Sequence, residues 1–251
     1  MSTPCVSCEN LAVGHDETVV VSGVNFSVQP GGITAVVGPS GCGKSTLLRA
    51  LAGLAEPIEG RSLLLGVDLV RAKDSERGAV LRRTGFLFQS SALWSSLTLR
   101  ENVELPLLEF AGVGAREARI LAEHKLAQVG LLNAADKLPT EISGGMAKRA
   151  GLARALALDP EVLFLDEPSA GLDPVTAAHL DDLVRRIRDT LGTAVILVSH
   201  DVPSIIRLAD FCVYLDSETR TMAAMGKPAE FLTSTAHPRA HAFFTSHRET
   251  V

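Results

Sequence analysis

The stretch GPSGCGKST, residues 38–46, places three glycines and a lysine directly after the apolar run ITAVV. It matches the pattern G-x-x-x-x-G-K-[ST], in which glycines let backbone N–H groups turn inward around a phosphate. The run LLRALAGL behind it predicts a helix, whose N-terminus adds positive potential. We therefore expect Lys44 to reach the β- and γ-phosphates of a nucleotide and Ser45 to ligate Mg²⁺. The alternative, a glycine turn that happens to hold a lysine, leaves the flanking strand and helix unexplained.

Two adjacent carboxylates end a second apolar run, in VLFLDEP at 162–168. Asp166 is suited to hold Mg²⁺ through water, and Glu167 is suited to orient and deprotonate an attacking water. The alternative is a pair of solvated acids that cap a strand. It is disfavoured because the same chain already carries a phosphate loop.

A third element is ISGGMAKR, residues 142–149. Ser143, Gly144 and Gly145 offer a hydroxyl and bare backbone N–H groups at the start of a predicted helix, which makes a second anion-binding element. Two phosphate-binding elements on different lobes of one chain indicate two half-sites that a second copy completes.

Three short apolar runs position these motifs: ITAVVG at 33–38, VLFLD at 162–166 and AVILVSH at 194–200. Each is rich in Val, Ile or Leu without alternation, as in strands of a parallel sheet covered on both faces. In open α/β sheets the ligand lies at the C-terminal ends of such strands. The sequence therefore predicts an α/β fold.

A helix is predicted after Asp173, an N-cap residue that is followed by Pro174 at the first helical position. Gly192 is the predicted C-cap. Between these ends, apolar residues recur at helical spacing: Leu180, Leu183, Val184, Ile187 and Leu191.

Residues 91–157 differ in pattern, because strand-like runs are absent there. Four residues of this segment fall on one helical face: Ala118, Ala122, Leu126 and Val129. We expect a helical subdomain inserted into an α/β core of residues 1–90 and 158–225. Residues 226–251 are expected to form a short helical tail of the same single domain.

The composition argues against nucleic acid as a partner. The 251-residue chain has a net charge of −5 and only 4% aromatic residues, so it lacks both a basic field and stacking surfaces. The N-terminal segment lacks the basic and apolar regions of a secretion signal. No uncharged apolar stretch reaches the roughly 18 residues of a membrane helix. We expect any role at a membrane to come through partner chains.

The cysteines raise two questions, one about a metal site and one about a reactive thiol. Cys5 and Cys8 form a lone C-x-x-C pair without the further ligands that a zinc site needs, so packing is expected. Cys42 lies inside the phosphate loop, where a helix N-terminus could lower its thiol pKa and make it reactive. A small filler residue is the alternative for Cys42.

The order of motifs resembles that of ATP-binding cassette (ABC) proteins across nearly the whole chain: GPSGCGKST, LFQSS, ISGGM, VLFLDEP, SAGLD and VSHD. The resemblance implies a P-loop NTPase (RecA-like) core with a parallel central sheet, N-terminal antiparallel strands and an inserted helical subdomain. It also implies an Mg²⁺-dependent ATPase whose two copies pair head to tail around ATP. The residues that it assigns to the nucleotide are His15, Gly38, Pro39, Ser40, Gly41, Cys42, Gly43, Lys44, Ser45 and Thr46.

The same resemblance implies a catalytic set and a metal site. Glu167, His200 and Gln89 would be catalytic, with His200 contacting the γ-phosphate and holding the attacking water together with Glu167. Gln89 would be the glutamine of the lid loop. Ser45, Gln89 and Asp166 would hold Mg²⁺, Asp166 through water.

Other residues are implied to act across the dimer. Ser143, Gly144 and Gly145 would contact the γ-phosphate of the partner copy's ATP, and Asp173 would lie in the loop that crosses the dimer seam. One departure lies beside them: family signatures commonly end in Gln, whereas this chain has Met146.

A second departure concerns the base of the nucleotide. The position that usually offers an aromatic ring to adenine is His15 in this chain. Imidazole stacks less well than tyrosine, which predicts weak base selectivity or adenine held mainly through the phosphates. A solvated loop histidine is the alternative.

A single cassette without a membrane span indicates a stand-alone subunit of a multi-chain transporter. Three stretches resemble the ATPase subunits of Mla-type systems: LFQSSALWSSLTLRENVELPL, ISGGMAKRAGLARALAL and GLDPVTAAHLDDLV. Those subunits work at the cytoplasmic face of the bacterial inner membrane with a permease, an MCE-domain protein and a small STAS-domain protein, to move phospholipid or other lipids. The form SAGLD departs from the Mla pattern, which leaves open a sister branch with another hydrophobic cargo.

Two other functions stay open on the sequence. An importer subunit for small polar solutes would share the ATP chemistry and differ in its partners, and a mechanical or signalling module would move no cargo. Trp94, the only tryptophan, follows Gln89 where cassette proteins dock the permease's cytoplasmic helix. It is either an exposed anchor, flanked by Arg100 and Glu101, or a core residue.

Overall fold

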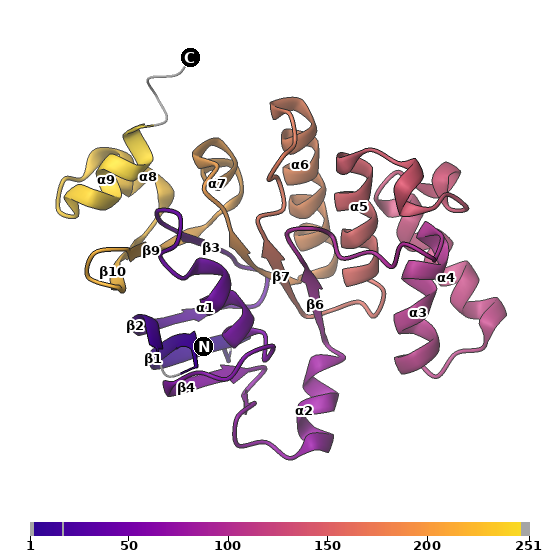
Figure 1. Cartoon of the computed structure of the whole chain (residues 1–251), viewed down its shortest axis with the longest axis horizontal. Helices are drawn as coiled ribbons and strands as arrows, with labels where there is room; N and C mark the ends of the chain where they lie inside the picture. The colour runs from indigo at the N-terminus through magenta and orange to yellow at the C-terminus, as the bar shows by residue number, and fades with distance from the viewer. Residues whose placement is uncertain (1–2, 17, 247–251) are drawn as a thin grey trace.

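The computed structural model describes residues 3–16 and 18–246, and within them ten strands form one sheet in the order β5-β4-β1-β2-β10-β9-β3-β8-β7-β6 (Figure 1). The antiparallel strands come first along this order. They are β1 (Val6–His15), β2 (Thr18–Val28), β4 (Glu59–Leu64) and β5 (Val67–Asp68). This arrangement confirms the predicted α/β fold with N-terminal antiparallel strands.

The parallel part of the sheet carries the predicted apolar runs. Its strands are β3 (Ile33–Val37), β6 (Thr84–Leu87), β7 (Val162–Asp166), β8 (Ala194–Val198) and β9 (Phe211–Asp216). Every residue of β3, β7 and β8 is buried, as strands covered on both faces require. Finally, β10 (Thr221–Gly226) pairs antiparallel with β9 and parallel with β2, which joins the two parts.

Alternate residues of the parallel strands enter two different cores. Ile33, Ala35 and Val37 belong to a core on one face of the sheet, whereas Val36 belongs to a core on the other face. This follows from the two-residue side-chain period of a strand. The apolar runs therefore need helices on both faces.

The helices divide between these two cores. On the face of Val36 lie α1 (Lys44–Leu51) and α2 (Asp74–Leu81). The other core receives α3 (Leu99–Phe110), α4 (Ala115–Gln128), α5 (Gly144–Ala155), α6 (Pro174–Leu191), α7 (Val202–Leu208), α8 (Pro228–Thr233) and α9 (Pro238–Thr245). Short 3-10 helices span Leu132–Ala134 and Pro139–Glu141.

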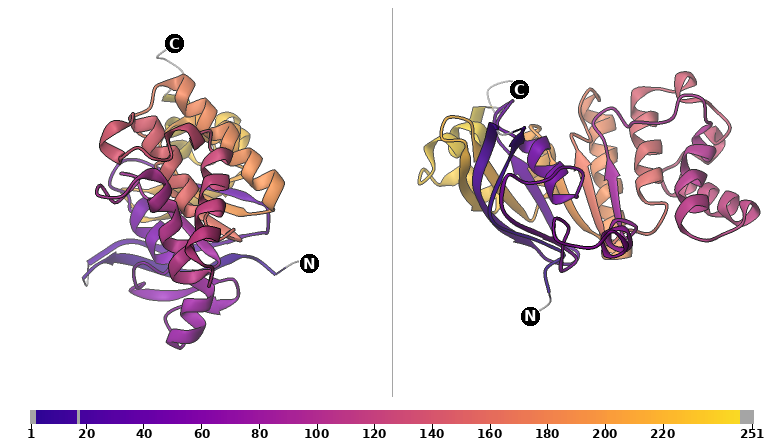
Figure 2. Two further views of the ribbon diagram at one scale, coloured as in Figure 1. Left: turned by 90° about the vertical axis from the view of Figure 1, so that its right-hand side faces the viewer. Right: turned by 60° about the horizontal axis from the view of Figure 1, so that its bottom comes forward.

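The helices α3, α4 and α5 lie beyond β6 at one end of the molecule, and α8 and α9 lie at the opposite end (Figures 1 and 2). The four residues predicted to share a helical face in α4 and just after it are all buried: Ala118, Ala122, Leu126 and Val129. The signature motif lies at the start of α5, which packs against α3 and α4.

The boundaries of α6 match the sequence prediction. Oδ1 of Asp173 accepts hydrogen bonds from the N–H groups of Val175 and Thr176, and Gly192 ends the helix with a φ of 68°. The apolar face is buried up to Ile187. Leu191 is 40% exposed despite its helical spacing, because it is the last helical residue and the chain turns away directly after it.

Candidate nucleotide-binding and catalytic site

The loop of residues 38–43 connects β3 to α1 and requires glycine at two positions. Gly38 has a φ of 147° and Gly43 a φ of 96°, in the region that favours glycine. A Cβ at Gly43 would lie 2.9 Å from Cγ1 of Val20, and one at Gly38 would overlap the carbonyl oxygen of Leu215. The loop backbone is thus held against neighbouring strands, with its N–H groups at the start of α1.

Lys44 is the first residue of α1, and its side chain turns back over the loop. Its Nζ donates to the carbonyl oxygens of Gly38 and Pro39, at 2.8 Å each. The residue is buried. Its hydrogen-bond partners are neutral carbonyls, and no acidic side chain pairs with it among the described residues, so Lys44 and the N-terminus of α1 together fit a polyphosphate.

Oxygen atoms suited to a divalent cation meet beside the loop. Oγ of Ser45 donates to Oδ1 of Asp166 at 2.6 Å, and Nη2 of Arg49 lies 3.7 Å from Oδ2 of Asp166. In the part of the chain that the structure describes, no group of three His, Cys, Asp or Glu could hold a metal alone. Mg²⁺ still fits, because it is usually held by one or two protein oxygens with phosphates and water.

Glu167, which is buried, and His200, whose side chain is 59% exposed, form an acid–imidazole pair at the same edge. Glu167 follows β7 directly, and His200 follows β8 after one intervening residue. Nδ1 of His200 lies 2.9 Å from Oε2 of Glu167, a distance at which a protonated Nδ1 donates to the carboxylate. An ionised carboxylate fixed in this way can accept a proton from water.

Gln89 lies in the turn after β6, and its side chain is exposed. Its carbonyl oxygen accepts a hydrogen bond from Nζ of Lys148 at 2.6 Å, and the same Nζ donates to the carbonyl oxygen of Glu167 at 2.9 Å. Lys148 is a site residue that sequence reasoning missed. A signal existed, because Lys148 shares a buried helical face with Gly151 and Leu152.

The signature residues do not join this group within one chain. Ser143 caps α5, its Oγ accepting from the N–H of Met146 at 3.3 Å. A Cβ at Gly145 would lie 2.8 Å from Cγ2 of Thr176 in α6, whereas Gly144 has open space around it. Helices α1 and α5 lie apart along the sheet (Figure 1). The predicted contact of Ser143, Gly144 and Gly145 with a phosphate thus needs another molecule, and it stays a prediction.

Asp173 has a structural role that the sequence predicted, as the N-cap of α6. Its Oδ2 accepts a hydrogen bond from Oγ1 of Thr176 at 2.5 Å. This bond and those from backbone N–H groups hold the pKa of Asp173 below its usual value. The carboxylate is exposed. Its role at a dimer seam stays a prediction.

His15 ends β1 and is exposed. Its Nε2 lies 3.4 Å from Oγ1 of Thr46, in the first turn of α1. The ring therefore lies beside the end of the phosphate loop, where a nucleoside attached to bound phosphates would extend. Stacking on adenine stays a prediction.

The hypothesis that Cys42 has a lowered thiol pKa is wrong. Burial raises the pKa of Cys42, and the opposing charge of Lys44 is the smaller effect. The side chain is 3% exposed, and its Sγ would lie 2.9 Å from a Cβ at Gly38. Cys42 therefore fills the space that the missing side chain of Gly38 leaves.

Cys5 and Cys8 also pack in the core. Both are buried and free, and Sγ of Cys8 lies 3.8 Å from the carbonyl oxygen of Phe26. Burial raises the pKa of Cys8 to about 12. These contacts favour the packing interpretation of the C-x-x-C pair.

Trp94 is exposed, which excludes the core interpretation. Its backbone is fixed by Asn102, whose side chain accepts from the N–H of Trp94 at 2.8 Å and donates to its carbonyl at 3.1 Å. The side chain is 59% exposed and borders a groove of about 740 Å³. Apolar residues that line this groove include Phe86, Phe88, Leu105, Pro106 and Phe110.

Arg100 and Glu101 do not line this groove, contrary to expectation. Arg100 forms ion pairs with Glu104, Glu123 and Asp136 inside the helical group. Glu101 completes the capping box of α3, where its Oε2 accepts from the N–H of Thr98 at 2.7 Å. Both residues lie in the first turn of α3, whereas the residues of α3 that line the groove are in its second half, from Leu105 to Phe110.

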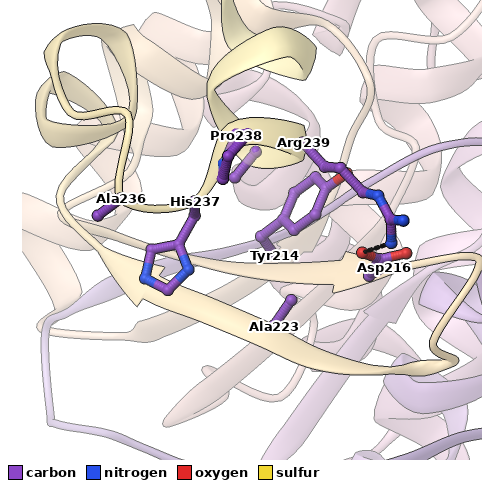
Figure 3. Close-up of a pocket in the computed structure, with 8 residues that line it drawn as sticks. Tyr214, Asp216, Ala223, Ala236, His237, Pro238 and Arg239 are labelled. Atoms are coloured by element: carbon purple, nitrogen blue, oxygen red, sulfur yellow. Dashed lines mark hydrogen bonds and ion pairs between the residues drawn. The ribbon is translucent and has the colours of Figure 1, made fainter.

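A smaller pocket of about 280 Å³ lies where α9 meets β9 (Figure 3). Arg239, in the first turn of α9, donates from Nη1 to Oδ2 of Asp216 at 2.7 Å. Tyr214 and His237 line the same pocket. None of the nucleotide or catalytic candidates borders it, so it is separate from the site at the strand ends.

A family model described as ABC transporter matches residues 21–170, which is more than half of the chain. The chain belongs to the ABC transporter family. It is 38% identical over 223 residues to the intermembrane phospholipid transport system ATP-binding protein MlaF of Haemophilus influenzae, covering 89% of this chain and 84% of the relative. It is 42% identical over 204 residues to the methionine import ATP-binding protein MetN 1 of Rhodococcus jostii, covering 81% of this chain and 60% of that relative.

Among solved ABC structures, the dimeric ATP-binding cassette MJ0796 in a post-hydrolysis state, bound to ADP and Pi, has a TM-score of 0.80 at 29% identity. The alignment covers 89% of this chain and 98% of that one. The chain is thus the ATPase subunit of an ABC transporter and uses ATP with Mg²⁺. Within the described residues, every helix is too short or too polar to cross a bilayer.

Thiol reagents are expected to modify the folded chain slowly. All four cysteines are buried, and burial raises the pKa of each, so at pH 8 the thiolate fraction lies below that of an ordinary cysteine. Labelling with a chromogenic disulfide should be slow for the native chain, should quicken as pH rises, and should reach all four thiols in guanidinium. Fast labelling of one thiol that ATP blocks and Cys42→Ala abolishes would contradict this assignment.

Proposed function

We propose that this ATPase drives the movement of phospholipid or a related lipid across the bacterial envelope, in a Mla-type transporter. The observation that carries the proposal is the signature variant at residues 146–149, in a chain 38% identical to MlaF over most of both lengths. That relative is named for intermembrane phospholipid transport. We place the subunit at the cytoplasmic face of the inner membrane, on a permease, together with an MCE-domain protein and a small STAS-domain protein.

The loop of residues 38–46 would hold the phosphates, with Lys44 and the N-terminus of α1 supplying positive charge. Ser45, Gln89 and Asp166 would hold Mg²⁺, Asp166 through water. When bound, Mg²⁺ neutralises phosphate oxygens and fixes their orientation. The hydrogen bond from Ser45 to Asp166 supports this assignment, because it holds both side-chain oxygens in one place.

Glu167 is the residue that we assign as general base. His200 holds Oε2, whereas Oε1 has no hydrogen bond to the protein among the described residues and is left to receive a proton from the attacking water. His200 would also contact the γ-phosphate.

The site would be completed by a second copy of the chain. Ser143, Gly144 and Gly145 of one copy would meet the phosphates bound to the other, and Asp173 would lie at the seam between them. The N-terminus of α5 supports this, because a Cβ at Gly144 would meet no atom within 4 Å, so a partner has room to approach this end of the helix. The solved MJ0796 cassette is itself a dimer.

The groove beside Trp94 is the surface that we assign to the permease. It is lined by aromatic and aliphatic side chains and extends to Arg154 and Ala155 at the end of α5. Trp94 stands five residues after Gln89. An exposed aromatic residue beside an apolar groove fits a helix that inserts its apolar face. The lid-loop glutamine would thereby lie between the nucleotide and the permease.

An importer for small polar solutes is the second candidate, favoured by the 42% identity to MetN 1. Reconstitution of the subunit with its co-purifying permease distinguishes them, with a fluorescent phospholipid and a labelled amino acid as probes. We expect ATP-dependent movement of the phospholipid. Movement of the amino acid alone would favour the importer, and intact ATP hydrolysis without movement of either would favour a mechanical module.

Lys44 and Glu167 are expected to fail in different ways when they are replaced. Lys44→Ala removes the charge that faces the phosphates, so ATP binding should weaken. Glu167→Gln keeps the shape and loses the base, so ATP should bind and remain, and size-exclusion chromatography should show an ATP-dependent dimer. The double variant should not dimerise with ATP. Turnover by Glu167→Gln near the wild-type rate would show that Glu167 is not the base.

Trp94→Ala is expected to weaken permease binding and to abolish lipid movement. Losing an aromatic anchor typically costs about 2 kcal/mol or more, roughly thirtyfold in affinity. The thermal midpoint and ATP binding of the isolated subunit should not change, because the side chain is exposed. The matched control is Ile120→Ala, which removes a side chain that is 60% exposed on α4, away from the groove. Equal loss of permease binding in both variants would refute a specific anchor.

A further inference from the structure

Lys148 is a buried cation whose hydrogen bonds go to the backbone of two proposed catalytic residues. The residue is 6% exposed, and Nζ donates to the carbonyl oxygens of Gln89 at 2.6 Å and of Glu167 at 2.9 Å. A buried ammonium is unfavourable unless it is well hydrogen-bonded. The hydrogen bonds to these two carbonyls therefore stabilise the buried ammonium of Lys148. In turn, Lys148 links the backbone at Gln89 to the backbone at Glu167.

Glu167 needs such an anchor because its backbone is strained. Its φ of 48° lies in the left-handed region, and the next residue is Pro168. The N–H donates to the carbonyl of Val198 at 3.0 Å, while the carbonyl accepts from the N–H of Ala170 at 3.2 Å and from Lys148. Rotation of this peptide would turn the carboxylate away from its partner imidazole.

The same helix also fastens the loop after Gln89. Arg154 donates from Nη1 to the carbonyl of Ala92 at 2.5 Å and from Nη2 to that of Ser91 at 2.9 Å. Both acceptor residues have positive φ values, 64° for Ser91 and 46° for Ala92. A Cβ at Gly151, which lies between Lys148 and Arg154 in α5, would be 3.2 Å from the side chain of Ser91. Helix α5 is thus tied to the lid loop at two points.

We propose that Lys148 is a positioning residue that aims Glu167 by holding its carbonyl, and that of Gln89, against α5. This rests on the role proposed above for Glu167 as the base. Since α5 begins with Ser143–Gly145, a nucleotide bound to that signature from the partner copy would act, through Lys148, on the base of this chain's own site. Each site of a dimer would then respond to occupation of the other.

Lys148→Met in the full chain tests this, because it keeps most of the apolar side chain and removes the donor. We expect kcat for ATP hydrolysis to fall by about tenfold to a hundredfold, while KM stays within about twofold. Lys148→Arg, which restores N–H donors, should recover most of the rate. The control is Lys125→Met, because Lys125 is 4% exposed and pairs with Asp159, which lies near the start of β7. It should lower stability and leave kcat unchanged.

Amide hydrogen exchange gives a readout that does not depend on turnover. In Lys148→Met without nucleotide, peptides covering residues 88–92 and 167–170 should exchange faster than in the wild type. Peptides of β1 and β2 should not change. Faster exchange throughout the chain, or equal changes in Lys125→Met, would mean that Lys148 contributes only global stability, and would overturn the proposal.

Glu167→Gln, measured alongside, separates the two proposals. If Glu167→Gln is inactive and Lys148→Met hydrolyses ATP at the wild-type rate, the positioning role alone is wrong. If Glu167→Gln is active, the base is misassigned and the positioning role falls with it. The double variant, Lys148→Met with Glu167→Gln, should hydrolyse ATP no more slowly than Glu167→Gln alone. If Lys148 acts only by positioning Glu167, its loss has no further effect once the base is removed. A further loss in the double variant would contradict action through Glu167.

Discussion

The candidate site depends on three parallel strands that end in register at one edge of the sheet. Val36 of β3 pairs with Val198 of β8, which pairs with Asp166 of β7. Groups that are far apart along the chain, such as Lys44, Asp166 and His200, therefore leave the sheet at the same edge. A one-residue slip of β7 would move Asp166 to the opposite face and separate it from Ser45. The alignment is fixed by burial, since all residues of these strands are covered on both faces.

Several charged side chains are buried at that edge and need hydrogen-bond partners, and the backbone provides most of them. Lys44 and Lys148 are both buried, and both are satisfied by pairs of carbonyl oxygens. Asp166 and Glu167 are also buried, and each has a side-chain partner, Ser45 for Asp166 and His200 for Glu167. The side-chain hydrogen bonds of both lysines go to neutral carbonyls, and among the described residues neither lysine pairs with an acidic side chain. A site that must attract phosphate and accept a proton needs both kinds of charge to remain available.

The features that were predicted from sequence are those set by local pattern. The apolar runs predicted β3, β7 and β8, and the Asp-Pro pair and Gly192 predicted the ends of α6.

The features that were missed depend on neighbours that are distant in the chain. The environment of Cys42 is decided by packing against Gly38 and the end of β9, which outweighs the nearby helix terminus. Trp94 could not be assigned to core or surface, because no periodic pattern surrounds it. Lys148 was overlooked because its partners lie 59 residues before and 19 residues after it.

Helix α5 contacts the proposed catalytic residues, the lid loop and the apolar groove. Its N-terminus carries the signature residues, its buried face carries Lys148, and its last turn carries Arg154, which both holds the lid loop and borders the apolar groove. The same groove is lined by Phe86 of β6, the strand that precedes Gln89. A helix inserted there would contact α5 and β6 together, and any change in their spacing would strain the carbonyl contacts of Lys148. Glu167 has a φ of 48°, and on the roles proposed above a small displacement at the groove would change the alignment of the proposed base. Under that proposal, coupling between the groove and the proposed base would pass through a single helix, α5.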